Sequence, residues 1–303
     1  MPASALMLCA SLLFALMAVC VKFASADYGA GEIVLYRSLI GLALMAVVMR
    51  RRGTAVRTPV PAMHFWRCLA GTSALCLWFY SLGGLPLGTA MTLNYMSSLW
   101  IACFLMGASL LASAGASARI DGRLFAAVLT GFAGVALVLR PTIAQDQLWH
   151  GLCGLLGGML AAMAYLQVTA LGRAGEPEDR VVFYFSLSGV VAGLLLALAT
   201  TGLHAHSARG GALLLAIGLL ATAAQWMMTR AYAIGSTLSV AALQYIGIVY
   251  SFGLGVWLFH DPVSAPSLAG TGLILAAGLA ATFLRTNSPA ADVRSLPSRP
   301  ADR

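Results

Sequence analysis

Charged residues are scarce in this sequence. Only 9% of the 303 residues are Asp, Glu, Lys or Arg, whereas soluble domains carry about 25%. Hydrophobic residues make up 60%, and the mean hydropathy is +0.87. A helix rises about 1.5 Å per residue, so a hydrocarbon core roughly 30 Å thick needs about 20 apolar residues. The composition excludes a soluble globular domain and predicts a polytopic membrane protein.

Nucleotide-binding and hydrolytic signatures are also missing. The sequence has no G-x-x-x-x-G-K-[ST] loop, no H-E-x-x-H motif and no G-x-S-x-G motif. Its six cysteines show no C-x-x-C or similar metal-ligand spacing. We therefore expect no enzymatic activity, no cofactor and no bound metal, and an ATP-driven pump would need a partner chain.

The net charge of +8 does not indicate nucleic-acid binding. Basic residues lie in short links between apolar runs and form no continuous basic domain. We expect the lipid bilayer as a partner, and no nucleic acid.

Ten apolar runs predict ten membrane helices. They span residues 5–26, 32–49, 65–83, 85–111, 124–139, 152–171, 181–200, 212–232, 238–259 and 268–284. The second run is expected to stop at Arg50-Arg51-Arg52, and Arg67 is expected at an inner helix end. Most arginines then lie on the side of the N-terminus, so the positive-inside rule places both termini in the cytoplasm. Residues 286–303, rich in Ser, Pro and Arg, have the composition of a disordered cytoplasmic tail.

The two halves of the chain repeat one another. Asn94-Tyr95 in the fourth run corresponds to Gln244-Tyr245 in the ninth, and Tyr80 corresponds to Tyr232. Because each half has five spans, the second half must enter the membrane from the opposite side. The sequence predicts an all-α membrane protein of two inverted five-helix repeats, residues 1–141 and 142–285.

Related helices with amide and phenol groups near mid-depth predict a cavity between the repeats, where secondary transporters place their substrate site. The main candidates are Asn94, Tyr95 and Ser98 with Gln244 and Tyr245. Amides and phenols can donate to and accept from a zwitterionic substrate. The alternative role for these residues is hydrogen bonding between helices.

Other side chains are secondary candidates for the cavity wall. Gln167 and Gln225 lie in the sixth and eighth runs. Trp78 and Trp100 either stack on a substrate ring or serve in packing.

Lys22 and Arg37 are positive charges inside apolar runs. A charge at the bilayer centre costs about 2.5–3.5 kcal/mol on insertion scales. Both side chains either snorkel to the headgroups or form a cationic wall for a carboxylate or phosphate. Arg37 is the stronger candidate because its planar fork can hold a carboxylate at two points. Phe185 occupies the equivalent place in the second half, which suits a substrate with one anionic end.

No carboxylate or histidine lies in the middle of an apolar run, where proton-coupled pumps often carry one. Glu32 or the substrate would have to carry a coupled proton, and exchange or facilitated movement is the alternative.

Three local strings resemble the drug/metabolite transporter superfamily, specifically its EamA-type members. They are Tyr36-Arg37-Ser38, the glycine-rich string from Thr130 to Arg140-Pro141, and Phe259-His260-Asp261-Pro262 before a glycine-rich last run. The resemblance covers about residues 5–285 and implies a ten-helix secondary carrier that works by alternating access.

We therefore expect a carrier of the bacterial inner membrane for a small polar metabolite. The resemblance favours export of an amino acid or an opine-like metallophore. One alternative is an importer of a nucleoside-like or vitamin-like solute such as S-adenosylmethionine or riboflavin. Another is an intramembrane enzyme or a structural subunit, and a homodimer stays open.

Overall fold

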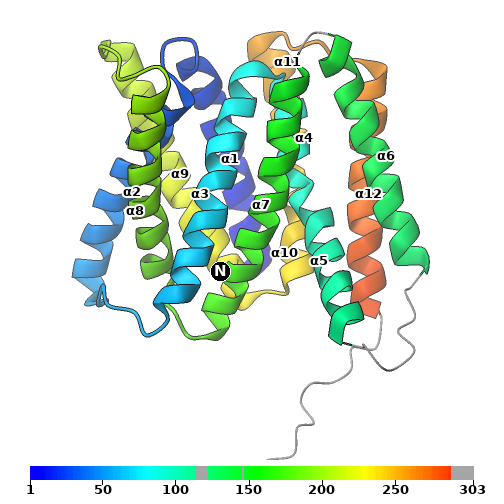
Figure 1. The fold of residues 1–303 in the computed structure, drawn as a ribbon, viewed down its shortest axis with the longest axis horizontal. Helices are drawn as coiled ribbons and strands as arrows, with labels where there is room; N and C mark the ends of the chain where they lie inside the picture. Colours follow the sequence, from blue (N-terminus) through cyan, green and yellow to red (C-terminus); the bar gives the residue numbers. More distant parts are fainter. Residues whose placement is uncertain (113–121, 145–146, 288–303) are drawn as a thin grey trace, which may run out of the picture.

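The computed structural model describes residues 1–112, 122–144 and 147–287, and their regular elements are α-helices (Figure 1). These helices are α1 (Ala3–Ala24), α2 (Ala30–Arg52), α3 (Pro61–Gly84), α4 (Leu87–Tyr95), α5 (Ser97–Ala112), α6 (Gly122–Ala144), α7 (Leu148–Arg173), α8 (Glu178–Ala199), α9 (Ala208–Ile234), α10 (Thr237–Leu243), α11 (Ile246–Phe259) and α12 (Ala265–Asn287). Of the predicted tail 286–303, residues 288–303 lie outside the described part.

Seven segments of the described chain are long and apolar enough to cross a membrane. They are Ala3–Ala24, Ala30–Arg52, Leu87–Ala108, Leu148–Arg173, Glu178–Ala199, Ala208–Ile234 and Ser239–Phe259. The helices α3, α6 and α12 have 24, 23 and 23 residues, which suffices by length alone. The prediction of an α-helical multi-pass membrane protein is confirmed.

The prediction that the arginine triplet stops the second helix was wrong. α2 continues through Arg50–Arg52 and ends before Gly53, whose φ is 69°. Long basic side chains extend into water while their backbone stays helical. Their charge also suits the negative C-terminal end of the helix dipole. The helix ends at Gly53 because glycine adopts the left-handed conformation without a steric cost.

The predicted fourth and ninth helices are interrupted near their centres, which corrects the expectation of unbroken spans. α4 ends at Tyr95 and α5 begins at Ser97, while α10 ends at Leu243 and α11 begins at Ile246. In the second interruption the amide nitrogens of residues 244, 245, 247 and 248 donate to carbonyls three residues earlier. These tighter turns replace the regular helical pattern. Irregular backbone at membrane depth is tolerated where protein surrounds it.

Helices from the two halves of the chain pack in pairs. α2 packs against α8, α6 against α12, α3 against α7, and α1 against α9. The interrupted helices also meet, since α4 contacts α11 and α5 contacts α10. α1 begins and α12 ends at the same end of the bundle, the lower end in Figure 1. We call it the N-terminal end and the other the opposite end.

At the N-terminal end a buried carboxylate ties the α7–α8 link to α3. Glu176 accepts hydrogen bonds from His64 Nε2 at 3.0 Å and Thr58 Oγ1 at 2.8 Å. Arg180 Nη1 donates to it at 3.1 Å. Burial alone would raise the pKa of Glu176, but the bonds from His64, Thr58 and Arg180 outweigh burial and lower that pKa.

This lowered pKa makes part of the stability acid-sensitive. The contribution of Glu176 is fully present above its unfolded pKa of about 4.3 and is lost as the pH falls towards the lower folded value. We expect Glu176→Gln to be less stable than wild type at neutral pH, and its melting temperature in detergent to fall less than that of wild type between about pH 5 and pH 3. Parallel curves for the two proteins would contradict this role.

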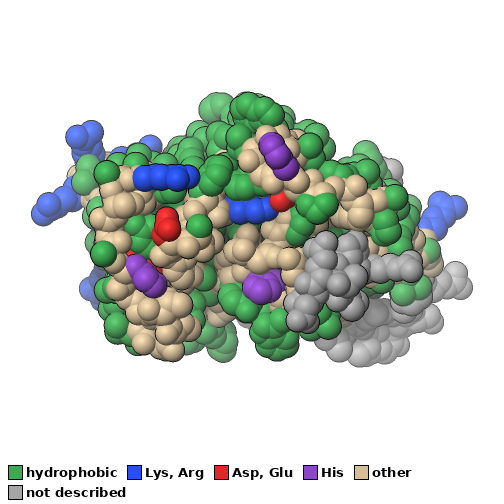
Figure 2. Space-filling view, turned by 90° about the horizontal axis from the view of Figure 1, so that it is seen from above, with side chains coloured by type: hydrophobic (Ala, Val, Ile, Leu, Met, Phe, Trp, Pro, Cys, Tyr) green, Lys and Arg blue, Asp and Glu red, His purple; other side chains and the backbone are tan. Residues whose placement is uncertain are grey.

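At the opposite end Glu32 is fully buried at the start of α2. It accepts hydrogen bonds from His204 Nδ1 at 2.8 Å and from the His204 backbone nitrogen at 3.2 Å, and it pairs with His206 Nε2 at 3.5 Å. Figure 2 looks onto this end, where charged and histidine side chains are scattered among hydrophobic and uncharged groups. Glu32 therefore belongs to a tie between α2 and the α8–α9 link.

Candidate functional site

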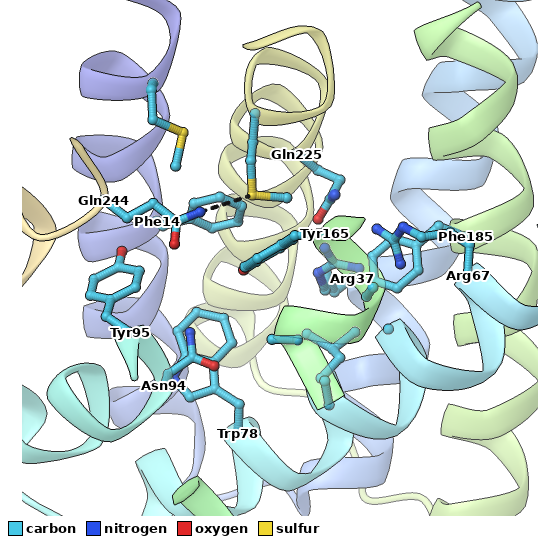
Figure 3. A pocket seen from close by; sticks show the side chains of 17 residues that line it. Phe14, Arg37, Arg67, Trp78, Asn94, Tyr95, Tyr165, Phe185, Gln225 and Gln244 are labelled. Atoms are coloured by element: carbon cyan, nitrogen blue, oxygen red, sulfur yellow. Dashed lines mark hydrogen bonds between the residues drawn. The ribbon is translucent and has the colours of Figure 1, made fainter. Parts of the chain in front are cut away.

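Two arginine side chains lie together inside the bundle. Arg37 of α2 is 5% exposed and Arg67 of α3 is 2% exposed. Their guanidinium carbons lie 5.2 and 4.4 Å from the ring centroid of Phe185 in α8, so one aromatic ring contacts both cations (Figure 3).

Neither arginine forms an ion pair with a carboxylate of the described residues. The Nε atoms of both, and Nη1 of Arg67, are buried without a hydrogen-bond partner. Buried charges are normally paired, because leaving water without a compensating partner is costly. Two adjacent cations with free donors are therefore suited to hold an anion.

The arginines form part of the wall of a central pocket (Figure 3). Its free volume is about 50 Å³, room for one or two water molecules. Six predicted candidates line it, namely Arg37, Trp78, Asn94, Tyr95, Gln225 and Gln244. The structure thus brings residues of both interrupted helices and Arg37 of α2 together in the wall of this pocket.

Several polar groups of this pocket lack partners. Gln244 Nε2 donates to the Tyr232 hydroxyl at 3.0 Å, while its Oε1 has no partner. Gln225 Nε2, the Tyr95 hydroxyl and Trp78 Nε1 are likewise buried and unpartnered. No Asp or Glu is among the described lining residues. The pocket therefore offers donors, an acceptor and two positive charges, and favours a polar anionic ligand.

Three predicted residues near the interruptions lie outside this pocket. Ser98 Oγ donates to the carbonyl of Ala241 at 2.8 Å and so joins α5 to α10. The ring of Tyr245 packs against Gly278 of α12. Trp100 contacts the ring of Phe132, with centroids 5.0 Å apart. Each of these contacts joins two helices, which agrees with the packing role that the sequence left open as an alternative.

Gln167 also lies apart, in a separate groove between α3 and α7 that Trp66 and Met163 share. Most residues of this groove are apolar, and unlike the central pocket it has no charged residue among its described lining residues.

Lys22 is neutralised by a partner distant in sequence. Its Nζ lies 2.7 Å from Asp261 Oδ1 and 4.6 Å from the ring centroid of Phe259. Asp261 Oδ2 also accepts from the backbone nitrogen of Leu87 at 2.7 Å. Lys22 thus joins the ends of α1 and α11 to the start of α4, and the central pocket does not include it.

This tie is expected to stabilise the opposite end. Asp261→Asn leaves Lys22 largely buried without its counter-charge, and removing one partner of a buried pair costs about 3–5 kcal/mol; since both groups are slightly exposed, a smaller loss is expected. The double variant Lys22→Met, Asp261→Asn should regain part of it. Thermal unfolding in detergent measures both, and a double variant no more stable than Asp261→Asn would contradict the pairing.

Arg67 was missed as a site residue, and its placement at an inner helix end is corrected. α3 begins at Pro61, four residues before the predicted start, so Arg67 lies in its second turn. Packing of α3 against α7 and α8 then covers the side chain. The available signal was the glycine four residues after Arg67, at Gly71. Residues four apart lie on one face of a helix, and the absence of a side chain at Gly71 leaves the space that Arg67 Nη1 occupies, since a Cβ there would overlap it. Tyr165, another lining residue, carried no comparable signal.

Comparisons with known proteins agree with this architecture. The chain is 32% identical over 272 residues to the pseudopaline exporter CntI of Pseudomonas aeruginosa, covering 89% of this chain and 92% of the exporter. It is 24% identical to an uncharacterized transporter of Helicobacter pylori over 90% of this chain and 92% of that protein. It is 28% identical to a riboflavin transporter of Rhizobium johnstonii over 76% and 74% of the two chains. No family model matches the chain.

A solved crystal structure shares the fold, with a TM-score of 0.67 and 18% identity over 93% of this chain and 98% of the other. The helical bundle, its central pocket with polar groups in the wall, and these relatives define a multi-pass membrane transporter. The chain belongs to the transporter family that includes the pseudopaline exporter CntI.

Proposed function

We propose that this protein exports a small carboxylated metabolite derived from amino acids, of the opine-like metallophore class, across the bacterial inner membrane. The observation that carries the proposal is the pair Arg37 and Arg67, buried together without a carboxylate partner among the described residues. Two planar guanidinium groups can hold carboxylates in bidentate geometry. The amides of Asn94, Gln225 and Gln244 then serve the remaining polar groups of the substrate.

The likeness to the pseudopaline exporter supports both the substrate class and the direction, because the alignment extends over nearly the whole of both chains. Pseudopaline itself is therefore the first compound to test.

We further propose an EamA-type architecture of ten spans in two inverted repeats, residues 1–141 and 142–285. The packing pattern supports it. A two-fold relation between the halves pairs α2 with its own equivalent α8 and α6 with α12, and it exchanges the α1–α9 pair with the α3–α7 pair. Alternating access then consists of rocking the halves about the central pocket, which must widen beyond its present volume.

The orientation proposed places the N-terminal end, and both termini, in the cytoplasm. Arg50, Arg51, Arg52, Arg57 and Arg173 belong to helix ends and links at that end. Cytoplasmic links carry such an excess of basic residues.

Import of a ring-containing solute is a second candidate function. The aromatic side chains of Phe14, Trp78 and Tyr165 line the pocket beside the polar groups, and they suit a flavin-like ring. The riboflavin transporter among the relatives gives this candidate a specific compound.

Comparative metabolomics of cells and medium, with and without the protein, separates the candidates. Export predicts that a carboxylated compound accumulates in cells and disappears from the medium when the protein is removed. Depletion from cells of a solute that remains in the medium would replace export with import. No change in any solute would favour a non-transport role.

Gly71→Ala is expected to impair transport through Arg67. The added Cβ overlaps Arg67 Nη1 and lies 3.2 Å from the Phe185 ring, so the guanidinium must move. We expect about a tenfold loss of kcat/KM, equivalent to roughly 1.4 kcal/mol, in a vesicle flux assay. Gly83→Ala is the matched control in α3, because its Cβ meets only Ser25 at 3.6 Å. Equal rates for the two variants would contradict the proposed role of Arg67.

A further inference from the structure

A second pocket lies at the N-terminal end of the bundle, with a volume of about 310 Å³. It is bounded by α5, α7, α9 and α10. Arg173 lies at its rim, and the hydroxyls of Thr169 and Thr237 lie 3.2 Å apart in its wall. Arg173 forms no ion pair with a carboxylate of the described chain. This pocket thus combines an available cation with hydroxyl groups.

The second pocket and the central pocket share the faces of two helices. On α7, Ala161 and Tyr165 line the central pocket, and Thr169 and Arg173 line the second. This spacing of four residues keeps all four side chains on one helix face. On α9, Gln225 and Met228 line the central pocket and Tyr232 lines the second. The two pockets therefore lie one after the other along the same faces of α7 and α9.

An aromatic partition separates the pockets. The rings of Tyr165 and Tyr232 are stacked, with centroids 5.1 Å apart and planes 18° apart. Tyr232 is fully buried, and its hydroxyl accepts the hydrogen bond from Gln244 Nε2. Gln244 lies at the interruption between α10 and α11, where the regular helical bonding is already broken.

We propose that the second pocket is the cytoplasmic entrance of the transport route, with an initial binding subsite for a substrate carboxylate at Arg173 and the Thr169–Thr237 hydroxyls. Tyr165, Tyr232 and Gln244 form the gate between this subsite and the central pocket. The identity of the ligand and the side it enters from rest on the proposed function.

Thiol labelling tests the route without requiring transport. Thr237→Cys in the second pocket and Ala164→Cys in the central pocket are each made in full-length protein whose six cysteines are replaced. A membrane-impermeant maleimide is added to inside-out vesicles and to intact cells. Leu203→Cys, in the exposed α8–α9 link at the opposite end, reports the opposite side.

Thr237→Cys should react about tenfold faster in inside-out vesicles than in intact cells, and Leu203→Cys should show the reverse. Ala164→Cys should react slowly in inside-out vesicles, and about fivefold faster once Tyr232→Ala removes the stacked ring, because labelling follows the opening of the passage. Faster labelling of Thr237→Cys from the outer side would overturn the entrance. If Tyr232→Ala leaves the labelling rate of Ala164→Cys unchanged, the proposed gate is overturned.

The subsite is tested by Arg173→Gln with pseudopaline as the probe. We expect KM to rise about tenfold with kcat unchanged, because the variant loses a charge-assisted hydrogen bond that forms before the transport step. Arg173→Lys should recover part of the loss. The control Arg57→Gln, an exposed arginine of the α2–α3 link, should leave KM unchanged.

An unchanged KM for Arg173→Gln would overturn the subsite while leaving export intact. Failure of wild-type protein to transport pseudopaline would contradict the proposed substrate. The labelling pattern would then still decide the route, so the two failures are distinguishable.

Discussion

Arg67→Met is expected to lower kcat/KM for a carboxylated substrate at least about 100-fold while leaving the protein as stable as wild type or more so. The loss corresponds to roughly 2.7 kcal/mol, a conservative value for a desolvated charge-assisted contact. Stability should not fall, because Arg67 is 2% exposed with two unpartnered nitrogens. A buried charge costs free energy because it has left water, and replacing it by an apolar side chain of similar length removes this desolvation penalty.

Flux in reconstituted vesicles and thermal unfolding in detergent, measured on the same preparations, test this prediction. Arg57→Met is the control, since that side chain is exposed in the α2–α3 link, and it should change neither quantity. A fall in melting temperature for Arg67→Met, with flux per folded molecule unchanged, would assign Arg67 to structure and remove it from the substrate site.

Arg37→Ala is expected to abolish transport of the carboxylated substrate, with a loss of kcat/KM at least as large as that of Arg67→Met. Expression and membrane insertion should stay near normal. Arg37 and Arg67 contact the same ring and are proposed to hold one ligand. Residues that act as a unit show non-additive effects. The double variant Arg37→Ala, Arg67→Met should therefore be little worse than either single variant.

Arg37→Lys is the informative companion variant. It keeps the charge but lacks the planar guanidinium group, so it cannot bind a carboxylate in bidentate geometry. We expect it to recover only part of the flux. Full flux in Arg37→Ala would show that Arg37 holds no substrate, and fully additive losses in the double variant would show that the two arginines act separately.

Composition and apolar runs were sufficient to predict a helical multi-pass protein, because the cost of burying backbone and charge in lipid leaves few alternatives. The prediction of Asn94, Tyr95 and Gln244 as neighbours came from the internal repeat, and the structure places all three in the central pocket. Arg37 could be found for a related reason, since a cation inside an apolar run requires a protein environment.

Features that depend on long-range packing could not be predicted. The partner of Lys22 is Asp261, 239 residues away, and no local pattern connects them. Arg67 was misplaced because the apolar run gave the wrong helix start, and a shift of four residues moved it from the helix end into the bundle. The interruptions at Met96 and at Gln244-Tyr245 were missed because neither contains a proline.

Flux of pseudopaline into inside-out vesicles tests the central claim most directly. The wild-type protein should accumulate pseudopaline in the vesicle lumen, and the Arg37→Ala and Arg67→Met variants, present at equal amounts, should not. Accumulation by both variants at the wild-type rate would contradict the assignment of the paired arginines to the substrate site.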